Sequence, residues 1–336
     1  MSTATHVPQT STLRRDELSA DDATATLRRV GARVLVRDSF LRLRYGDGFS
    51  SARAMAYQFV LSFVPLVIAV VGLSSSIRAE KPAAALRATL LSLAPGTGGD
   101  AVKQALTSGA ATNGSTGRVV LVLGLGTALA ALATAMAQIE RGANRLYGVQ
   151  RDRPALHKYG RASLLMVTAG IPAMLGFLLL VAGGPAVDAL QEAYALPDAV
   201  VTAVQWLRWP VGALLDLAAI TALFRWAPRR RQPTWSWLAF GAALSLLLWL
   251  GFTGLLALYV ARSSSFGQVY GPLTGVFALL LWAQLTSISL LVGLAFAAQL
   301  EAVRAGVPSP VATDPQADER ALTGSTVVLT PQPASP

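Results

Sequence analysis

The sequence predicts an all-α, polytopic membrane protein with six transmembrane helices and both termini in the cytoplasm. Three observations support this fold class. The 69 residues from Gln232 to Leu300 contain one charged side chain, Arg262. Hydrophobic residues make up 53% of the chain and charged residues 14%, whereas about a quarter of the residues in a soluble domain are charged. The basic residues flank apolar runs instead of forming a separate patch. A lipid environment is therefore predicted.

The six spans follow from windows that are long enough and almost free of charge. A helix needs about 20 predominantly apolar residues to cross a hydrocarbon core of about 30 Å. The predicted spans cover about 57–77, 119–139, 162–184, 209–226, 235–261 and 272–299. The fourth span has the weakest signal, because it is short, has Asp216 inside it and has Arg225 at its end.

The distribution of Lys and Arg predicts the orientation, because cytoplasmic segments retain these residues during insertion. Six spans place 21 Lys and Arg on the side of the two termini and 7 on the opposite side. This excess predicts that both termini are cytoplasmic.

The segments around the six-helix domain, 49–303, have different compositions. Residues 1–25 are rich in Ser, Thr and Asp, and the tail 304–336 is rich in Pro, so both are expected to be disordered. Residues 26–48 combine apolar positions at helical spacing with many arginines, which predicts an amphipathic helix on the anionic cytoplasmic leaflet. The arginines expected to contact this leaflet are Arg28, Arg29, Arg33 and Arg37. Nucleic acid is the alternative partner, but topology already requires basic charge here, so no nucleic acid is expected.

The outer loop between the first two spans is the only sizeable one. It is expected to contain two short helices, at about 82–94 and 100–111, that connect the spans or form a lid.

Asp216 is the strongest single functional signal. A carboxylate inside a span costs about 2.5–3.5 kcal/mol on insertion scales, so it normally faces the bundle interior. One interpretation is a proton- or cation-linked site in a transport path, and the other is a structural carboxyl. The other candidate path residues are Tyr57, Asn144, Gln284 and Tyr270. Polar groups such as Asn144 and Gln284 also commonly form hydrogen bonds between neighbouring helices, so both readings stay open.

Four residues are expected to have structural roles. Pro65 and Pro172 lie within the first and third spans and should kink them. Gly271 precedes the sixth span and allows the backbone to bend beside Tyr270. Gly293 lies within the sixth span and is likewise expected to be structural.

Several of these positions belong to a recognisable pattern over residues 35–303. The pattern includes Ala52, Ala54, Ala56, Tyr57, Ser62 and Pro65, the run 144–149 (Asn-Arg-Leu-Tyr-Gly-Val), Pro228, Gly241, Tyr259, Tyr270, Gly271, Trp282 and Gly293. In these residues the chain resembles the YihY/BrkB family of bacterial inner-membrane proteins, often mislabelled ribonuclease BN. The resemblance implies a multi-pass protein of the bacterial plasma (inner) membrane.

The chain departs from the family pattern at two places. The family often has Trp in the second span, where this chain has 130–133 (Ala-Ala-Leu-Ala). The family also commonly has an acid two residues after the glycine of the sixth span, where this chain has Ala295.

The residue types argue against an enzyme. The chain has no cysteine and two histidines, His6 and His157, and neither belongs to a metal-binding motif. It also lacks phosphate-loop and serine-nucleophile motifs. We therefore expect no catalytic residue, no metal and no cofactor, and in particular no ribonuclease activity.

Two functional hypotheses have comparable support. The first is that the protein translocates, or helps to export, a lipid-linked or amphipathic envelope component. The second is a non-transporting membrane scaffold or envelope-integrity factor. An intramembrane enzyme is a third and weaker alternative. Membrane lipids are the expected partners, and the sequence leaves the oligomeric state open.

Overall fold

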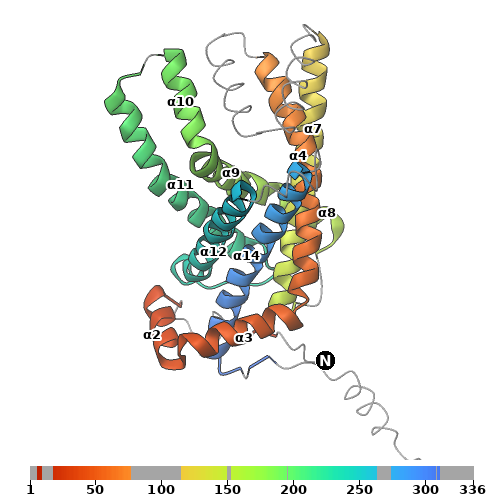
Figure 1. The fold of residues 1–336 in the computed structure, drawn as a ribbon. Coiled ribbons are helices and arrows are strands. Elements are labelled where there is room, and N and C mark those ends of the chain that lie inside the picture. Colours follow the sequence, from red (N-terminus) through yellow and green to blue (C-terminus); the bar gives the residue numbers. More distant parts are fainter. Residues whose placement is uncertain are drawn as a thin grey trace, which may run out of the picture.

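The computed structural model describes residues 6–9, 18–76, 115–149, 153–194, 196–262, 274–307 and 309–310. These residues form helices and connections, without a strand among them (Figure 1). The prediction of an all-α, polytopic membrane protein is confirmed. The two helices expected in the outer loop, together with Tyr270 and Gly271, lie outside the described residues.

Most of the observed helices are longer than the spans predicted for them, at one end or at both. Their bounds are α2 Ala20–Val30, α3 Ala32–Tyr45, α4 Gly48–Ser76, α7 Ser115–Leu146, α8 Ala155–Leu165, α9 Ile171–Phe177, α10 Gly183–Tyr194, α11 Asp198–Trp226, α12 Trp235–Arg262 and α14 Thr274–Arg304. Two π-helical segments, η1 Met166–Gly170 and η2 Leu178–Ala182, connect α8, α9 and α10 into one continuous helical stretch.

Five helical stretches of the described chain are long and apolar enough to cross a membrane. They are Val122–Leu146, His157–Glu192, Asp198–Trp226, Trp235–Val260 and Gly275–Arg304. The first predicted span falls on α4, where most side chains beyond Ser62 are outside the described residues. The count of six spans therefore stays a prediction.

The N-terminal region differs from the expected disordered tail followed by one helix. Helix α2 begins at Ala20, because the Ser19 backbone N–H and side-chain hydroxyl both donate to Asp22 Oδ2 at 3.2 Å and cap the helix. The chain breaks at Gly31, whose φ of 88° favours glycine, and continues as α3. The predicted boundaries 1–25 and 26–48 are therefore wrong as helix limits. The capping pair sets the start of α2 at Ala20, and the break at Gly31 divides the predicted helix into α2 and α3.

The two ends of the described chain meet at one end of the bundle. Helix α3 packs against α14, and the Arg304 guanidinium forms an ion pair with Asp22 at 3.0 Å. Figure 1 shows α2 and α3 beside the last turns of α14. We call this the inner end, because the basic residues predict that it is cytoplasmic.

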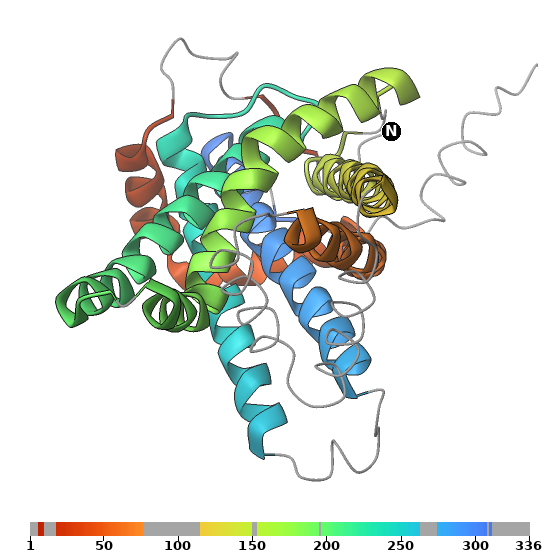
Figure 2. The ribbon, with the colours of Figure 1, turned by 90° about the horizontal axis from the view of Figure 1, so that it is seen from above.

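Burial is concentrated toward the inner end. On α7, Ala143 and Leu146 are buried, whereas Val122 and Leu123, nearer the outer end, are exposed. On α11 the buried Phe224 contrasts with the exposed Trp206 in the same way. In Figure 2 the α4 and α7 pair is seen end-on, while α12 and α14 extend together in another direction and α10 and α11 in a third. The three helix pairs therefore converge at the inner end and separate outward.

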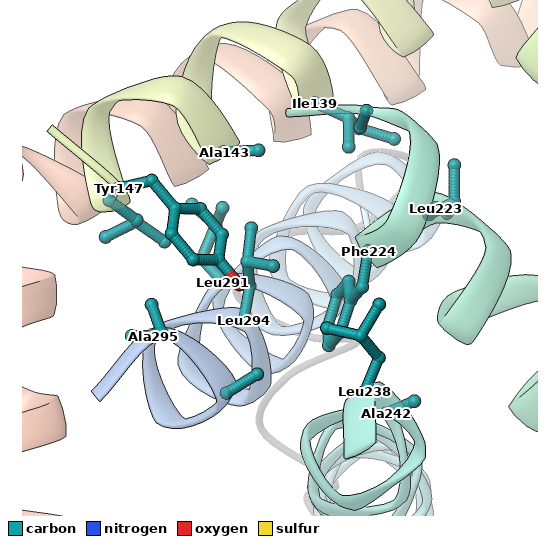
Figure 3. Packing of buried hydrophobic residues seen from close by; sticks show 14 of the residues in the cluster. Ile139, Ala143, Tyr147, Leu223, Phe224, Leu238, Ala242, Leu291, Leu294 and Ala295 are labelled. Carbon is teal, nitrogen blue, oxygen red and sulfur yellow. The ribbon is translucent and has the colours of Figure 1, made fainter. Parts of the chain in front are cut away.

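The inner core joins four long helices. Figure 3 shows side chains that converge from α7, α11, α12 and α14. They include Ile139, Ala143, Tyr147, Leu223, Phe224, Leu238, Ala242, Leu291, Leu294 and Ala295. The alanines among them, Ala143, Ala242 and Ala295, are small enough to let helix backbones approach closely where lipid offers no hydrophobic driving force for helix association.

Helices α12 and α14 are in closest contact at a pair of glycines. A Cβ atom on Gly293 would overlap Ser245 Oγ and the Gly241 carbonyl oxygen. A Cβ on Gly241 would lie 2.5 Å from the Gly293 carbonyl oxygen and 2.8 Å from Ala297 Cβ. Each glycine therefore packs directly on the backbone of the other helix.

We predict that Gly293→Ala destabilises the protein by about 1–3 kcal/mol, because the added methyl group has no space. The matched control is Gly275→Ala on the same helix, where a Cβ would meet nothing within 4 Å and better helix propensity should leave stability unchanged or slightly raised. Thermal unfolding in detergent, followed by tryptophan fluorescence, measures both. Equal melting temperatures for the two variants would contradict the predicted close crossing.

Candidate functional site

Asp216 lies on α11 and is 6% exposed. Its carboxylate packs against the backbone of α9 at Gly176, which is itself buried. A Cβ on Gly176 would overlap Asp216 Oδ1 and lie 2.9 Å from the Gly212 carbonyl oxygen. Gly176 thus leaves the space that the Asp216 side chain fills, while Gly212 lets the backbones of α9 and α11 approach each other at Gly176.

The α9 segment beside Asp216 has a π-helical segment on each side. A proline ring clashes with the carbonyl group four residues earlier. For Pro172 this carbonyl belongs to Thr168 in η1, and for Pro185 it belongs to Val181 in η2. This clash offers a local cause for each widened segment, although Pro65 and Pro210 lie inside α4 and α11 without one. The kink that the sequence predicts at Pro172 stays a prediction. Such widened turns are frequent at functional sites.

The two arginines of α11, Arg208 and Arg225, do not pair with Asp216. Arg225 donates from NH1 to the Pro233 carbonyl oxygen at 2.8 Å. Arg208 donates to the Gln205 carbonyl oxygen at 3.3 Å and stacks over the Trp209 ring, 5.0 Å from its centroid. Within the described part of the chain, no hydrogen bond or ion pair joins another residue to the Asp216 carboxylate.

An aromatic cluster adjoins this carboxylate site. Phe177, the residue after Gly176, packs against Trp282 of α14 and Trp249 of α12, with ring centroids 5.5 and 6.2 Å apart. Trp249 donates from Nε1 to Thr286 Oγ1 at 3.2 Å. The α9 segment that packs against the Asp216 side chain is therefore in contact with the α12 and α14 pair as well as with α11.

The other predicted path residues do not surround Asp216. Tyr57 is 62% exposed on α4, and Gln284 is half-buried on α14. Asn144 is buried near the inner end, where its Oδ1 accepts the backbone N–H of Arg229 at 2.7 Å. Tyr270 is outside the described residues. The predicted path thus falls on several separate places, of which only Asp216 is a buried acid within a span.

A second polar site lies at the inner end, and the sequence analysis missed it. We call it the inner-end charge cluster, and its members are Arg42, Tyr147, Arg230, Gln299 and Glu301. Arg230 forms an ion pair with Glu301 at 2.5 Å, with side chains only 2% and 1% exposed. Arg42 donates from Nε to Gln299 Oε1 at 2.9 Å and from NH1 to the Leu146 carbonyl oxygen at 3.1 Å. The cluster therefore connects α3, α7, α14 and the loop after α11.

The electrostatics of the cluster keep Arg42 charged. Burial lowers the pKa of Arg42 from 12.5 to about 10, against the opposing attraction of Glu301, so its guanidinium is protonated at neutral pH. Burial raises the pKa of Tyr147 above its usual value of 10, so the phenol stays neutral. The Arg230 guanidinium lies over the Tyr147 ring, 4.6 Å from its centroid, which is a cation–π geometry.

Part of the N-terminal segment packs onto this cluster. Val7 is buried, and its N–H donates to the Tyr147 carbonyl oxygen at 3.3 Å. Arg230 in turn donates to the carbonyl oxygens of Val7 and Pro8, each at 3.3 Å. Residues 6–9 are therefore ordered against the bundle, although the composition of 1–25 predicted disorder.

A further buried ion pair lies nearby. Glu140 on α7 forms an ion pair with Arg153, whose NH1 lies 2.7 Å from Glu140 Oε1. Arg153 also donates to the carbonyl oxygens of Ala227 and Pro228 at 3.3 and 3.4 Å. This arginine thus connects α7 to the end of α11. The sequence signal for both ion pairs was present, because Glu140 and Glu301 are the acids directly at the inner ends of two apolar runs.

The run 144–149 ends α7 and contributes to the cluster. Gly148 has a φ of 70°, and the Val149 N–H donates to the Asn144 carbonyl oxygen at 2.8 Å, a hydrogen bond typical of a glycine-terminated helix. Tyr147 and Asn144 then hold Arg230 and Arg229 as described above. The run 144–149, part of the family pattern, therefore terminates α7 and supplies two residues that contact the loop after α11.

A family model described as virulence factor BrkB matches residues 39–318 of this chain. The chain belongs to the BrkB family. This membership confirms the predicted resemblance. The match includes the inner-end charge cluster apart from its N-terminal contacts, as well as Asp216. No solved structure matches this BrkB-family chain.

Three relatives of this BrkB-family chain show how far the similarity extends. YfkH of Bacillus subtilis, named a ribonuclease-like protein, is 22% identical over 258 residues, 77% of this chain and 92% of YfkH. A UPF0761 membrane protein of Rhodospirillum centenum is 27% identical over 299 residues, 86% of this chain and 63% of the relative. A UPF0761 membrane protein of Azoarcus is 28% identical over 277 residues, 78% of this chain and 64% of the relative. The chain thus spans under two thirds of the latter two proteins.

The ribonuclease-like name belongs to that relative. Among the described residues of this BrkB-family chain, no group of three His, Cys, Asp or Glu side chains is placed to hold a metal ion. The absence of enzymatic activity stays a prediction.

We predict that Glu301→Gln destabilises the protein by about 3–5 kcal/mol, because it leaves the Arg230 charge buried without its counter-ion. The control is Arg304→Gln, which removes the half-exposed pair with Asp22 and should cost about 0–1 kcal/mol. Thermal unfolding in nanodiscs measures both changes. A double-mutant cycle with Arg230→Met and Glu301→Met should show that the double variant loses less than the sum of the single changes. Additive losses would mean that the pair is not coupled.

Proposed function

We propose that this BrkB-family protein translocates, or helps to export, a lipid-linked or amphipathic component of the bacterial envelope. The protein acts in the inner membrane with both termini in the cytoplasm, and its role is not enzymatic. The observation that carries the proposal is the buried Asp216 carboxylate, which packs on the Gly176 backbone between two π-helical segments.

The physical argument starts from the cost of this carboxylate. An acidic group inside a span is expensive, and such groups mark substrate, ion or proton pathways in membrane proteins. Ion pairs and hydrogen bonds offset that cost at the inner end, but none from the described residues does so at Asp216. A carboxylate in this environment favours taking up a proton or a cation, and release of that ligand changes the preferred packing of α9 against α11.

The arrangement of the helix pairs supports the same function. Buried ion pairs and the apolar core hold the pairs together at the inner end, whereas their outer halves separate. Transport requires an element with two arrangements around a site near the middle of the membrane. The stretch from α8 to α10, which two π-helical segments interrupt beside Asp216, is the segment best suited to move.

We predict that Asp216→Asn abolishes transport while the protein still folds. Proteoliposomes with fluorescently labelled phosphatidylglycerol and an internal pH dye, under an imposed pH gradient, measure lipid movement and proton flux. The control is Asp188→Asn, which removes an exposed carboxylate of α10 and should leave both rates unchanged. Size-exclusion chromatography and melting temperature test folding.

The same experiment can also contradict the transport proposal. If the wild-type protein moves neither lipid nor protons, and Asp216→Asn leaves an envelope phenotype intact, the scaffold or envelope-integrity role takes its place. In that role the inner-end charge cluster would be structural, and variants of the cluster would be the ones that lose function.

We further predict that Gly176→Ala reduces the transport rate at least tenfold without removing any charge. The added methyl group would displace the Asp216 carboxylate, and the resulting overpacking should raise the free energy of the transport-competent packing by more than about 1.4 kcal/mol. Gly126→Ala on α7 is the matched control, since a Cβ there meets nothing within 4 Å. The same flux assay compares the two variants. Unchanged transport by Gly176→Ala would show that the position of Asp216 is not important.

A further inference from the structure

One face of α3 is tightly held against the bundle. Arg42 is bound to Gln299 and to the Leu146 carbonyl oxygen, and Leu35 and Leu43 are buried beside it. Asp38, on the same face, accepts a hydrogen bond from Ser309 Oγ at 2.7 Å. Because polar and apolar contacts both hold this face, the orientation of α3 about its own axis is set. The predicted leaflet helix therefore does not include Arg42 in its basic face.

The opposite face of α3 is exposed and carries two kinds of side chain. At 3.6 residues per turn, Arg33, Arg37 and Arg44 project in nearly the same direction, and all three are exposed. Val36 and Phe40 are exposed on the adjoining edge of this face. Within the described residues, none of the three arginines forms an ion pair. We call these five residues, together with Phe49 of α4, the leaflet face.

The leaflet face lies beside the first turns of α4, the helix of the first predicted span. Only Gly46 and Asp47 separate α3 from α4, and Figure 1 shows α3 lying across the inner end of the bundle. Phe40 packs edge-on against Phe49 in the first turn of α4, with ring centroids 6.0 Å apart. Arg53, one turn later on α4, is exposed, so a charged residue marks the level at which the apolar part of α4 begins.

We infer that the leaflet face docks on the anionic lipid of the leaflet into which α4 inserts. The aromatic and aliphatic edge is placed among the upper acyl chains, and the three guanidinium groups are placed at the phosphate level, as in interfacial helices. Arg28 and Arg29, exposed in the last turn of α2, add charge beside this face. The inference does not depend on transport activity, because it rests on α3 and the first turns of α4.

Charge complementarity identifies the occupant. A juxtamembrane Lys or Arg near an anionic surface is worth about 1 kcal/mol, or about fivefold in the ratio of docked to undocked helix. Three arginines on one face therefore favour an anionic leaflet over a zwitterionic one by about a hundredfold. The exposed phenyl rings give the face an apolar component that an acidic protein surface would not need.

The natural absence of cysteine makes a direct test practical. The full chain with Val36→Cys carries a nitroxide label and is reconstituted in vesicles of phosphatidylcholine, with or without about 30% phosphatidylglycerol. Collision with oxygen and with a water-soluble nickel complex reports the depth of the label. We expect the label to enter the membrane in the anionic vesicles and to move toward water in the zwitterionic ones.

Paired charge variants complete the test. Arg37→Gln in the labelled chain should reduce the ratio of docked to undocked helix about fivefold, whereas Arg231→Gln, at an exposed position in the loop after α11, should leave it unchanged. Circular dichroism and melting temperature check that each variant folds. A label exposed to water in both lipids, or an equal effect of the two arginine variants, would overturn the inference.

Discussion

The buried ion pair between Arg230 and Glu301 is the interaction on which the arrangement of the inner end depends. Two charges removed from water are stable only when each has a counter-charge and further hydrogen bonds. Tyr147, Val7 and Pro8 supply contacts to Arg230, and they come from α7 and the N-terminal segment. Satisfying this one pair therefore brings together parts of the chain that are far apart in the sequence.

The outer half of the bundle lacks a comparable constraint within the described residues. Its helices expose apolar side chains, which lipid solvates as well as protein does. Helix pairs in this half are free to separate without an energetic penalty for exposing apolar surface. Asp216 lies where buried and exposed parts of α11 meet, since Gly212 and Ala219 are buried around it and Leu214 is exposed. A carboxylate at this boundary can respond to a change in helix packing, which the inner-end pairs resist.

The predictability of the site differed from residue to residue. Asp216 was identifiable because a charge inside an apolar run is rare and costly. Arg42 and Arg230 were not, because basic residues beside spans are also required for topology and have the same composition signal whether they are exposed or buried. Gly176 was equally inconspicuous, since its role follows from the side chain on another helix that packs against it. Tyr57 and Asn144 were predicted as path residues from the sequence pattern, but in the structure neither lies beside Asp216.

By itself the sequence determined that the protein is helical and embedded in a membrane, because hydrophobic length and charge distribution depend on local composition. It did not determine the π-helical segments, since Pro172 and Pro185 follow such segments whereas Pro65 and Pro210 lie inside α-helices without one. Only the tertiary structure decided which arginines are buried, which face of α3 is free and what surrounds Asp216. Those outcomes depend on contacts between residues such as Arg42 and Gln299, which are separated by more than two hundred positions and whose proximity no local pattern encodes.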